Sequence, residues 1–140
     1  MKVKIKTPDW QPLKYETEWA VWFDFKTIHD ITFQPQEFKL IETWVVIQIP
    51  LWYMLQIQPR SSTFKKHWLV QVNSVWIIDQ DYCWDNDTIK FAYINISDQK
   101  QFIPANTRIW QWVFVRIEKP EFEVVEKIEE KSRWWFWSTW

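Results

Sequence analysis

The chain of 140 residues contains no glycine, and it contains 14 tryptophans. Average usage would place glycine at about 7% of positions, so roughly ten glycines are missing. Tight turns often need positive φ angles, which cost residues other than glycine roughly 1–2 kcal/mol each. Several tryptophans stand at turn-like places, including Trp52 and Trp84. Two interpretations follow: the chain is an aromatic-rich β protein, or tryptophan occupies the positions where glycine belongs.

Composition and charge exclude several classes of protein. The 17 basic and 18 acidic side chains give a formal net charge of −1, which offers no electrostatic basis for binding nucleic acid. The single cysteine, Cys83, excludes a disulfide framework and a cysteine-based zinc site. The first ten residues lack the apolar stretch of a signal peptide, and no apolar run is long enough to span a membrane. We therefore expect one cytoplasmic domain with no membrane partner.

Hydrophobic periodicity predicts short β-strands along most of the chain. Alternating or β-branched runs bounded by turn signals are typical of an all-β sandwich, jelly roll or barrel. Such runs cover residues 3–6, 45–49, 53–58, 69–72, 75–78, 89–96, 108–117 and 122–125. One short helix is expected from Ser61 to His67, with Ser61 or Ser62 as its N-cap. The polar run that starts at Glu126 predicts a linker to a carboxyl-terminal tail.

Two segments in the first half of the chain carry side chains suited to chemistry. Residues 20–25 place the carboxylate of Asp24 within an apolar strand. Residues 59–62 place a guanidinium and two hydroxyls just before the expected helix, a combination that suits phosphate. Simpler interpretations are a strand-end carboxylate and an ordinary helix cap.

Three further segments follow in the second half. Asp79 and Asp81 end an apolar strand, and period two would put both carboxylates on one face, where they could bind a metal or act as a base. The simpler interpretation is a polar turn. Residues 107–111 fit a strand with one solvated face, and residues 133–140 would make an exposed, strongly apolar tail.

With glycine substituted for tryptophan, five ordered segments resemble the motifs of the trimeric dUTP pyrophosphatases, the dUTPases. These segments are residues 20–25, 59–62, 73–84, 106–111 and 136–140. Each motif is weak by itself, but five in the family's order and spacing, spread over nearly the whole chain, are specific. The resemblance implies a distorted, barrel-like jelly roll with one short helix. It also implies a core of residues 1–126 and an arm of residues 127–140 that closes over a site between subunits of a homotrimer.

The resemblance implies hydrolysis of dUTP to dUMP and pyrophosphate, which keeps uracil out of DNA and supplies dUMP for thymidylate synthesis. Asp79 would be the general base that activates water for attack on the α-phosphorus. Asp24 would help to hold Mg²⁺ through water, because Mg²⁺ usually keeps several waters beside substrate phosphates. The residues expected to contact phosphate oxygens are Arg60, Ser61, Ser62 (through its backbone N–H) and Gln111.

The same resemblance assigns recognition of the base and the sugar. Asn73 and the hairpin backbone, including that of Ile78, would read the uracil edge, with no space for the thymine methyl and a mismatch to the cytosine amino group. The Tyr82 ring would pack on the deoxyribose and leave no room for a 2′-OH. The arm residues expected to close over the nucleotide, with the Phe136 ring stacked on uracil, are Arg133, Phe136, Ser138 and Thr139.

The chain departs from the family pattern chiefly at glycine. Tryptophan stands where the motifs have glycine or a small residue, at Trp22, Trp76, Trp84, Trp110, Trp135, Trp137 and Trp140. Arg133 stands closer to Phe136 than the motif arginine usually does, so either Arg133 or Lys131 is expected to contact phosphate. In some bacterial lineages UGA encodes glycine, whereas a common code reads it as tryptophan, which would explain both counts at once. Deliberate replacement of glycine by tryptophan is the alternative cause.

Three alternative functions have distinct signatures. A dCTP deaminase shares the fold and an Arg-Ser-Ser segment but needs a catalytic glutamate within residues 89–95, which contain none. A carbohydrate-binding β-sandwich would carry its tryptophans along one strand face, whereas these fall at turns and motif glycines. A non-catalytic nucleotide-binding relative of dUTPase is the third. Since indoles at motif glycines would strain turns and occupy substrate space, we expect the tryptophan-bearing chain to have little activity.

Overall fold

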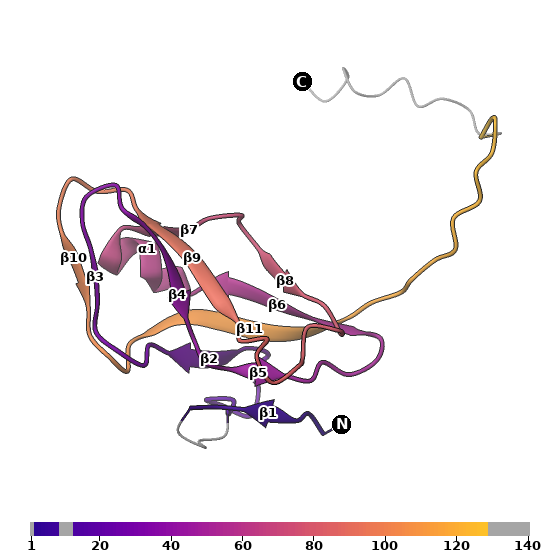
Figure 1. Ribbon diagram of the computed structural model, residues 1–140, viewed down its shortest axis with the longest axis horizontal. Helices are drawn as coiled ribbons and strands as arrows, with labels where there is room; N and C mark the ends of the chain where they lie inside the picture. Colours follow the sequence, from indigo (N-terminus) through magenta and orange to yellow (C-terminus); the bar gives the residue numbers. More distant parts are fainter. Residues whose placement is uncertain (1, 9–12, 129–140) are drawn as a thin grey trace.

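The computed structural model describes residues 2–8 and 13–128, which form strands and a single helix (Figure 1). The bounds are β1 (Ile5–Lys6), β2 (Phe23–Lys26), β3 (Ile31–Phe33), β4 (Phe38–Glu42), β5 (Val46–Ile47), β6 (Tyr53–Pro59), α1 (Ser61–His67), β7 (Leu69–Gln71), β8 (Trp76–Ile78), β9 (Lys90–Asn95), β10 (Gln101–Ile103) and β11 (Arg108–Arg116). The helix in this part of the chain is too short to cross a membrane.

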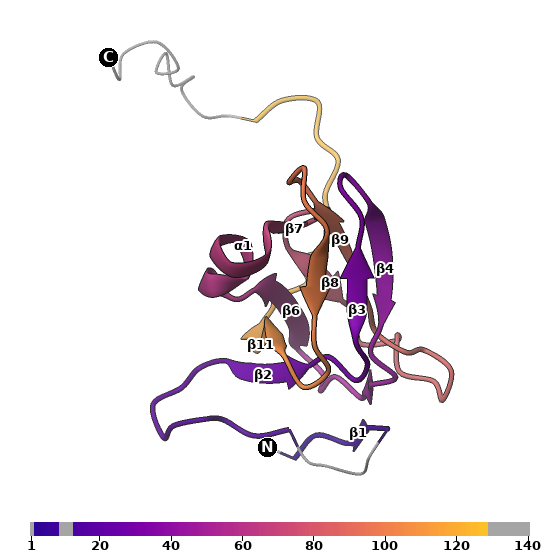
Figure 2. The ribbon, with the colours of Figure 1, turned by 90° about the vertical axis from the view of Figure 1, so that its left-hand side faces the viewer.

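Two larger antiparallel sheets make up most of the fold. One has the strand order β2-β11-β6-β8 and the other β4-β9-β7, while β1 pairs with β5 and β3 with β10. Figure 2 shows β2, β11 and β6 on one side of the molecule and β3, β4 and β9 on the other. Side chains of both sheets meet between them: the ring of Phe91 on β9 stacks on that of Trp110 on β11, with centroids 4.1 Å apart. This arrangement confirms the predicted all-β, jelly-roll-like architecture.

The helix prediction is confirmed in its bounds and wrong in its cap. α1 begins at Ser61, but Arg60 occupies the N-cap position and no side chain caps the helix. The start of the helix is held by β11 instead. The Ile109 carbonyl accepts hydrogen bonds from the Arg60 N–H (3.0 Å) and the Thr63 hydroxyl (2.9 Å). A tertiary contact therefore replaces the local hydroxyl cap that the sequence suggested.

The predicted strands are found with one exception, most of them with shortened ends and β6 longer by one residue at Pro59. No strand forms at residues 122–125, because this part of the chain runs free of the core and the Phe122 and Val124 side chains are 91% and 99% exposed. A segment with alternating side chains therefore forms a strand only where a partner strand is present to hydrogen-bond its backbone. Strands β3, β4 and β10 were not predicted. On β4 both faces carry apolar residues, such as exposed Leu40 and buried Ile41, so polar alternation is absent.

Tryptophan occupies two unusual kinds of place in this fold. Trp44, Trp52 and Trp68 have φ angles of 59°, 66° and 52°, in the left-handed region that favours glycine. Trp110 and Trp112 are 1% and 0% exposed, and their indole N–H groups have no hydrogen-bond partner among the described residues. A buried N–H without a partner costs roughly 1–3 kcal/mol. Both kinds of place are unfavourable to tryptophan.

Candidate functional site

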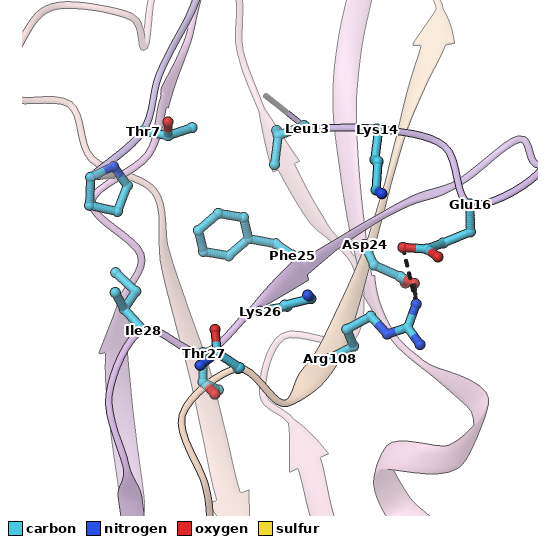
Figure 3. Close-up of a pocket in the computed structure, with 12 residues that line it drawn as sticks. Thr7, Leu13, Lys14, Glu16, Asp24, Phe25, Lys26, Thr27, Ile28 and Arg108 are labelled. Carbon is cyan, nitrogen blue, oxygen red and sulfur yellow. Dashed lines mark hydrogen bonds and ion pairs between the residues drawn. The ribbon is translucent and has the colours of Figure 1, made fainter. Parts of the chain in front are cut away.

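A cluster of opposite charges surrounds Asp24 on β2. The Asp24 side chain is 10% exposed and forms an ion pair with Arg60. Its Oδ2 atom also lies 3.5 Å from Nη1 of Arg108, which lies 3.1 Å from Oε1 of Glu16. Figure 3 shows Glu16, Asp24 and Arg108 pointing toward one another. The resemblance identified Asp24 and Arg60 and placed Arg108 in its fourth motif, while Glu16 joins them only through the tertiary structure.

Strand register explains why these groups meet. Phe23 and Phe25 face the core, so Asp24 between them points to the other face of the sheet. Asp24 is paired with Gln111 across β2 and β11, and Gln111 is in turn paired with Gln58 of β6. Arg60 follows directly after β6 and so reaches the same region. Three of the expected polar residues are thus assembled by adjacent strands.

A β-bulge places the Arg-Ser-Ser segment beside these strands. The register between β11 and β2 shifts between Arg108 and Trp110, which leaves Ile109 without a partner on β2. Its carbonyl accepts from Arg60 and Thr63, as described above, and also from the Tyr93 hydroxyl at 3.4 Å. Burial raises the pKa of Tyr93, so this hydroxyl stays protonated and can donate. The bulge therefore ties the start of α1, with Ser61 and Ser62, to β11 at Ile109, two residues before Gln111.

The Asp24 carboxylate offers an unused ligand atom. Its Oδ1 is buried and has no hydrogen-bond partner among the described residues. Asp24 lines a cavity of about 340 Å³ together with Lys14, Lys26 and Arg108. Within residues 2–8 and 13–128, no cluster of three or more His, Cys, Asp or Glu side chains could hold a metal by itself. A single free carboxylate oxygen fits Mg²⁺, which takes one or two carboxylates plus substrate phosphates and water.

The residues expected to bind uracil, in the hairpin formed by β7, β8 and the turn between them, lie at the other edge of the four-stranded sheet. Asn73 and Ser74 form the turn between β7 and β8, both with positive φ, and Ile78 ends β8. Asp79 follows in an irregular segment, where its carbonyl accepts from the Tyr82 N–H at 3.3 Å. The expectation that period two would align Asp79 with Asp81 is wrong, because β8 ends at Ile78 and the chain turns there.

The two groups of expected site residues are far apart within one chain. Asp24 lies on β2 and Asp79 follows β8, which are the two edge strands of this sheet. Asp24 is level with Gln58 on β6, whereas Ile78, just before Asp79, is level with Leu55. Strand spacing and rise then put the two carboxylates about 20 Å apart. A single protomer does not bring the expected base and the expected metal ligand together.

The expected arm residues Lys131, Arg133, Phe136, Ser138 and Thr139 lie outside the described residues. The segment that leads to them leaves the end of β11 and extends away from the body of the molecule (Figure 1). Along it, Phe122, Val124 and Ile128 are 91%, 99% and 75% exposed. Apolar side chains in such an extended segment have no covering surface within their own described chain.

Curated proteins align with this chain over most of its length. The dUTPase family model matches residues 9–134. A deoxyuridine 5′-triphosphate nucleotidohydrolase of Finegoldia magna is 38% identical over 136 residues, covering 95% of this chain and 93% of the relative. A prophage-derived deoxyuridine 5′-triphosphate nucleotidohydrolase of Bacillus subtilis is 32% identical over 127 residues, covering 90% of this chain and 87% of the relative.

Solved structures share the fold. The dUTPase of Streptococcus mutans matches with a TM-score of 0.76 at 26% identity, covering 84% of this chain and 98% of that chain. The dUTPase of Staphylococcus bacteriophage 80alpha, solved with dUPNHPP, matches with a TM-score of 0.81 at 21% identity, covering 94% of this chain and 92% of that chain. The second likeness concerns the fold alone. Because the family model matches residues 9–134 and the sequence relatives align over nearly the whole length, the chain belongs to the dUTPase family.

Proposed function

We propose that this protein hydrolyses dUTP to dUMP and pyrophosphate. The observation that carries the proposal is the grouping of Asp24 and Gln111, on adjacent strands, with Arg60, which begins the Arg-Ser-Ser segment. A guanidinium, an amide and hydroxyls gathered on one face suit a triphosphate chain. Membership of a family whose curated members are deoxyuridine 5′-triphosphate nucleotidohydrolases supplies the substrate.

The reaction needs a base and phosphate-holding groups. Asp79 accepts a proton from water as the water oxygen bonds to the α-phosphorus, and the bond from that phosphorus to the bridging oxygen breaks to release pyrophosphate. Arg60, the Ser61 hydroxyl, the Ser62 N–H and Gln111 hold phosphate oxygens. Charge that develops on these oxygens is stabilised by donors already fixed by β11 and the bulge.

Mg²⁺ is the proposed cofactor, with Asp24 as its protein ligand. When bound, Mg²⁺ would neutralise charge on the phosphate oxygens and help to orient the triphosphate. The buried, unpartnered Oδ1 of Asp24 fits this role. Arg60, which pairs with Asp24 in the free chain, is within reach of the same substrate phosphates. A variant dUTPase from phage phi11 of S. aureus, similar in fold, coordinates a structural Mg(II) ion.

Selection of the base and sugar is assigned to the hairpin. Asn73 and the backbone at Ile78 would pair with the uracil edge, where the thymine methyl has no space and cytosine presents the wrong donor pattern. The Tyr82 ring would pack against deoxyribose. Tyr82 is 40% exposed in the single chain, and its hydroxyl donates to the Thr88 carbonyl at 3.0 Å, which orients the ring.

The separation of Asp24 from Asp79 supports a homotrimer with sites between subunits. Two different apolar surfaces are available for such an assembly. One is the outer face of the four-stranded sheet around Val113 and Ile77, and the other is the outer face of β4 and β7 at Phe38 and Val70. Contact between two unlike surfaces generates a closed ring, rather than a two-fold dimer, when the rotation from one subunit to the next closes after three steps. In such a ring, Asp24 of one subunit meets Asp79 of the next.

Mixing two inactive variants tests this assembly. Trimers of Asp24→Asn alone or of Asp79→Asn alone should each lose activity, because every site lacks one carboxylate. Trimers refolded from an equal mixture should regain about a quarter of the normal turnover, since one site in four then combines two intact residues. Sedimentation should show a trimer in each preparation. No recovery from mixed trimers would show that both carboxylates of a site come from one chain.

The arm of residues 127–140 is proposed to close over the nucleotide, with Phe136 on the uracil and Arg133 or Lys131 on phosphate. Its lead-in segment supports an arm that crosses to another subunit. Within residues 2–8 and 13–128 no surface covers the exposed Phe122 and Val124 side chains, which favours a covering surface on another subunit. The proposed trimer supplies neighbouring surfaces within reach of this segment.

We propose further that the 14 tryptophans stand at glycine positions, through UGA codons that the native host translates as glycine. The left-handed backbone at Trp44, Trp52 and Trp68 supports this, as do the partnerless indoles of Trp110 and Trp112. The full-length chain with glycine at all 14 positions is called the glycine form below. It is the form in which we expect activity.

A substrate comparison tests the proposed function. The glycine form should convert dUTP to dUMP and pyrophosphate with kcat/KM at least about 10²-fold above that for dCTP or dTTP. Product analysis by chromatography separates the alternatives. Deamination of dCTP would favour the deaminase-like function, and tight nucleotide binding without turnover would favour a non-catalytic relative. Either outcome would refute dUTP hydrolysis.

A further inference from the structure

Gln71 is a buried amide that ties two parts of the hairpin region together. It lies on β7 with its side chain directed to the interior, and the residue is 5% exposed. Its Nε2 donates to the Ser74 carbonyl at 2.7 Å and to the Ile57 carbonyl at 3.3 Å. Both partners are acceptors, so the amide nitrogen must be the atom that faces them. Gln71 thus joins the β7–β8 turn to strand β6.

The turn held by Gln71 has an unfavourable backbone. Asn73 and Ser74 have φ angles of 68° and 60°. A left-handed conformation is disfavoured for residues with a Cβ atom, and serine adopts it less readily than asparagine. Two successive residues of this kind keep one geometry only when their surroundings fix it. The bond from Gln71 to the Ser74 carbonyl fixes the second of them directly.

The second bond sets where the turn lies relative to the sheet. Ile57 is the residue of β6 that pairs with Trp76, the first residue of β8. Through Ile57, Gln71 fixes the turn to the strand that leads to Arg60. Gln71 and Ser74 also line a cavity of about 430 Å³ that Arg60 borders. Neither of the two bonds depends on the residue at position 76, so both are retained with glycine there.

Burial of the Gln71 amide also carries a free-energy cost. The Gln71 Oε1 atom is buried and has no hydrogen-bond partner among the described residues. An apolar side chain of similar size would fill the same space without leaving an acceptor unpaired. The two hydrogen bonds that the amide nitrogen donates offset this cost, and both hold the turn that carries Asn73.

We propose that Gln71 is a positioning residue for base recognition: it holds the Asn73–Ser74 turn in the geometry in which Asn73 reads uracil. The proposal rests on the function proposed above, in which Asn73 contacts the base. Gln71 itself touches neither substrate nor phosphate. It acts through the turn, so its loss should weaken binding and selection of the base while the chemistry at the α-phosphorus is unchanged.

Replacement of Gln71 by methionine tests the proposal. Methionine has a similar volume and no donor. In the glycine form, Gln71→Met should raise KM for dUTP about tenfold, the equivalent of two ordinary hydrogen bonds, and leave kcat within about twofold. The ratio of kcat/KM for dUTP to that for dCTP should fall as well. An unchanged KM and an unchanged ratio would overturn the proposal.

Thr43→Val is the matched control. Thr43 is 0% exposed, and its hydroxyl donates to the Ile89 carbonyl at 2.6 Å, away from the turn. This variant should lower the unfolding midpoint and leave KM and the dUTP/dCTP ratio unchanged. A rise in KM equal to that of Gln71→Met would mean that general loss of stability causes both effects, and the positioning role would be rejected.

Amide hydrogen exchange gives a readout that does not require turnover. The N–H groups of residues 73–75 should exchange faster in Gln71→Met than in the parent, and those of β9 should not. Equal exchange rates for residues 73–75 in Gln71→Met and in the parent would also overturn the proposal. A parent that fails to hydrolyse dUTP would refute the proposed function. Exchange data would then still decide whether Gln71 holds the turn.

Discussion

Asp79→Asn should lower kcat for dUTP in the glycine form by about 10²–10⁴-fold, the usual contribution of a general base. Asparagine has nearly the same shape as aspartate, but its amide does not accept the proton that the attacking water must lose. Phosphate and uracil contacts remain, so KM should stay within a few-fold. Steady-state release of pyrophosphate measures both constants. Retention of normal turnover would refute the assignment of Asp79 as the base.

Asp85→Asn is the control for this variant. Asp85 lies in the same loop region, its side chain is 96% exposed, and within the described part of the chain it pairs with Lys6 at 3.8 Å. Such an exposed pair contributes little to stability. Removing this charge should leave kcat and KM unchanged. A comparable loss in Asp85→Asn would point to the charge of the loop rather than to proton transfer.

The glycine form should be far more active than the tryptophan-bearing chain, and three of its replacements should each stabilise the fold. Trp44→Gly, Trp52→Gly and Trp68→Gly should each raise the free energy of unfolding by about 1 kcal/mol. Relief of the left-handed backbone exceeds the added freedom of the unfolded chain at such positions. Urea unfolding measures each change. dUTP turnover measures the combined effect of all 14 replacements.

Trp19→Gly is the matched control. Trp19 is 88% exposed and is not among the residues with positive φ. Glycine there relieves no backbone strain and increases the freedom of the unfolded chain, so stability should stay equal or fall slightly. The codons of the gene decide why tryptophan stands at these positions. UGG codons there would refute the proposal that the native host translates UGA as glycine. A tryptophan-bearing chain with robust dUTP turnover would show that glycine is not required.

The five motifs, the short helix and the all-β class were predicted from the sequence. Turn chemistry and alternation are local properties, so Ser61–His67 and most strands could be placed from residue order. Residues 122–125 show where this fails, because alternating side chains form a strand only when another strand supplies bonding partners. The cap of α1 fails for a related reason. Its donors are held by the carbonyl of Ile109, a residue that is remote in the sequence.

The sequence by itself determined the chemistry available to this protein: which carboxylates, cations and amides it carries, and in what order. Only the tertiary structure decided which of them meet. Core packing sets the strand order β2-β11-β6-β8, which joins Asp24 to Arg60 and puts Asp79 at the far edge. The same packing buries Gln71 beneath the Asn73–Ser74 turn. Strand order depends on contacts between residues far apart in the chain, and local periodicity carries no record of those contacts.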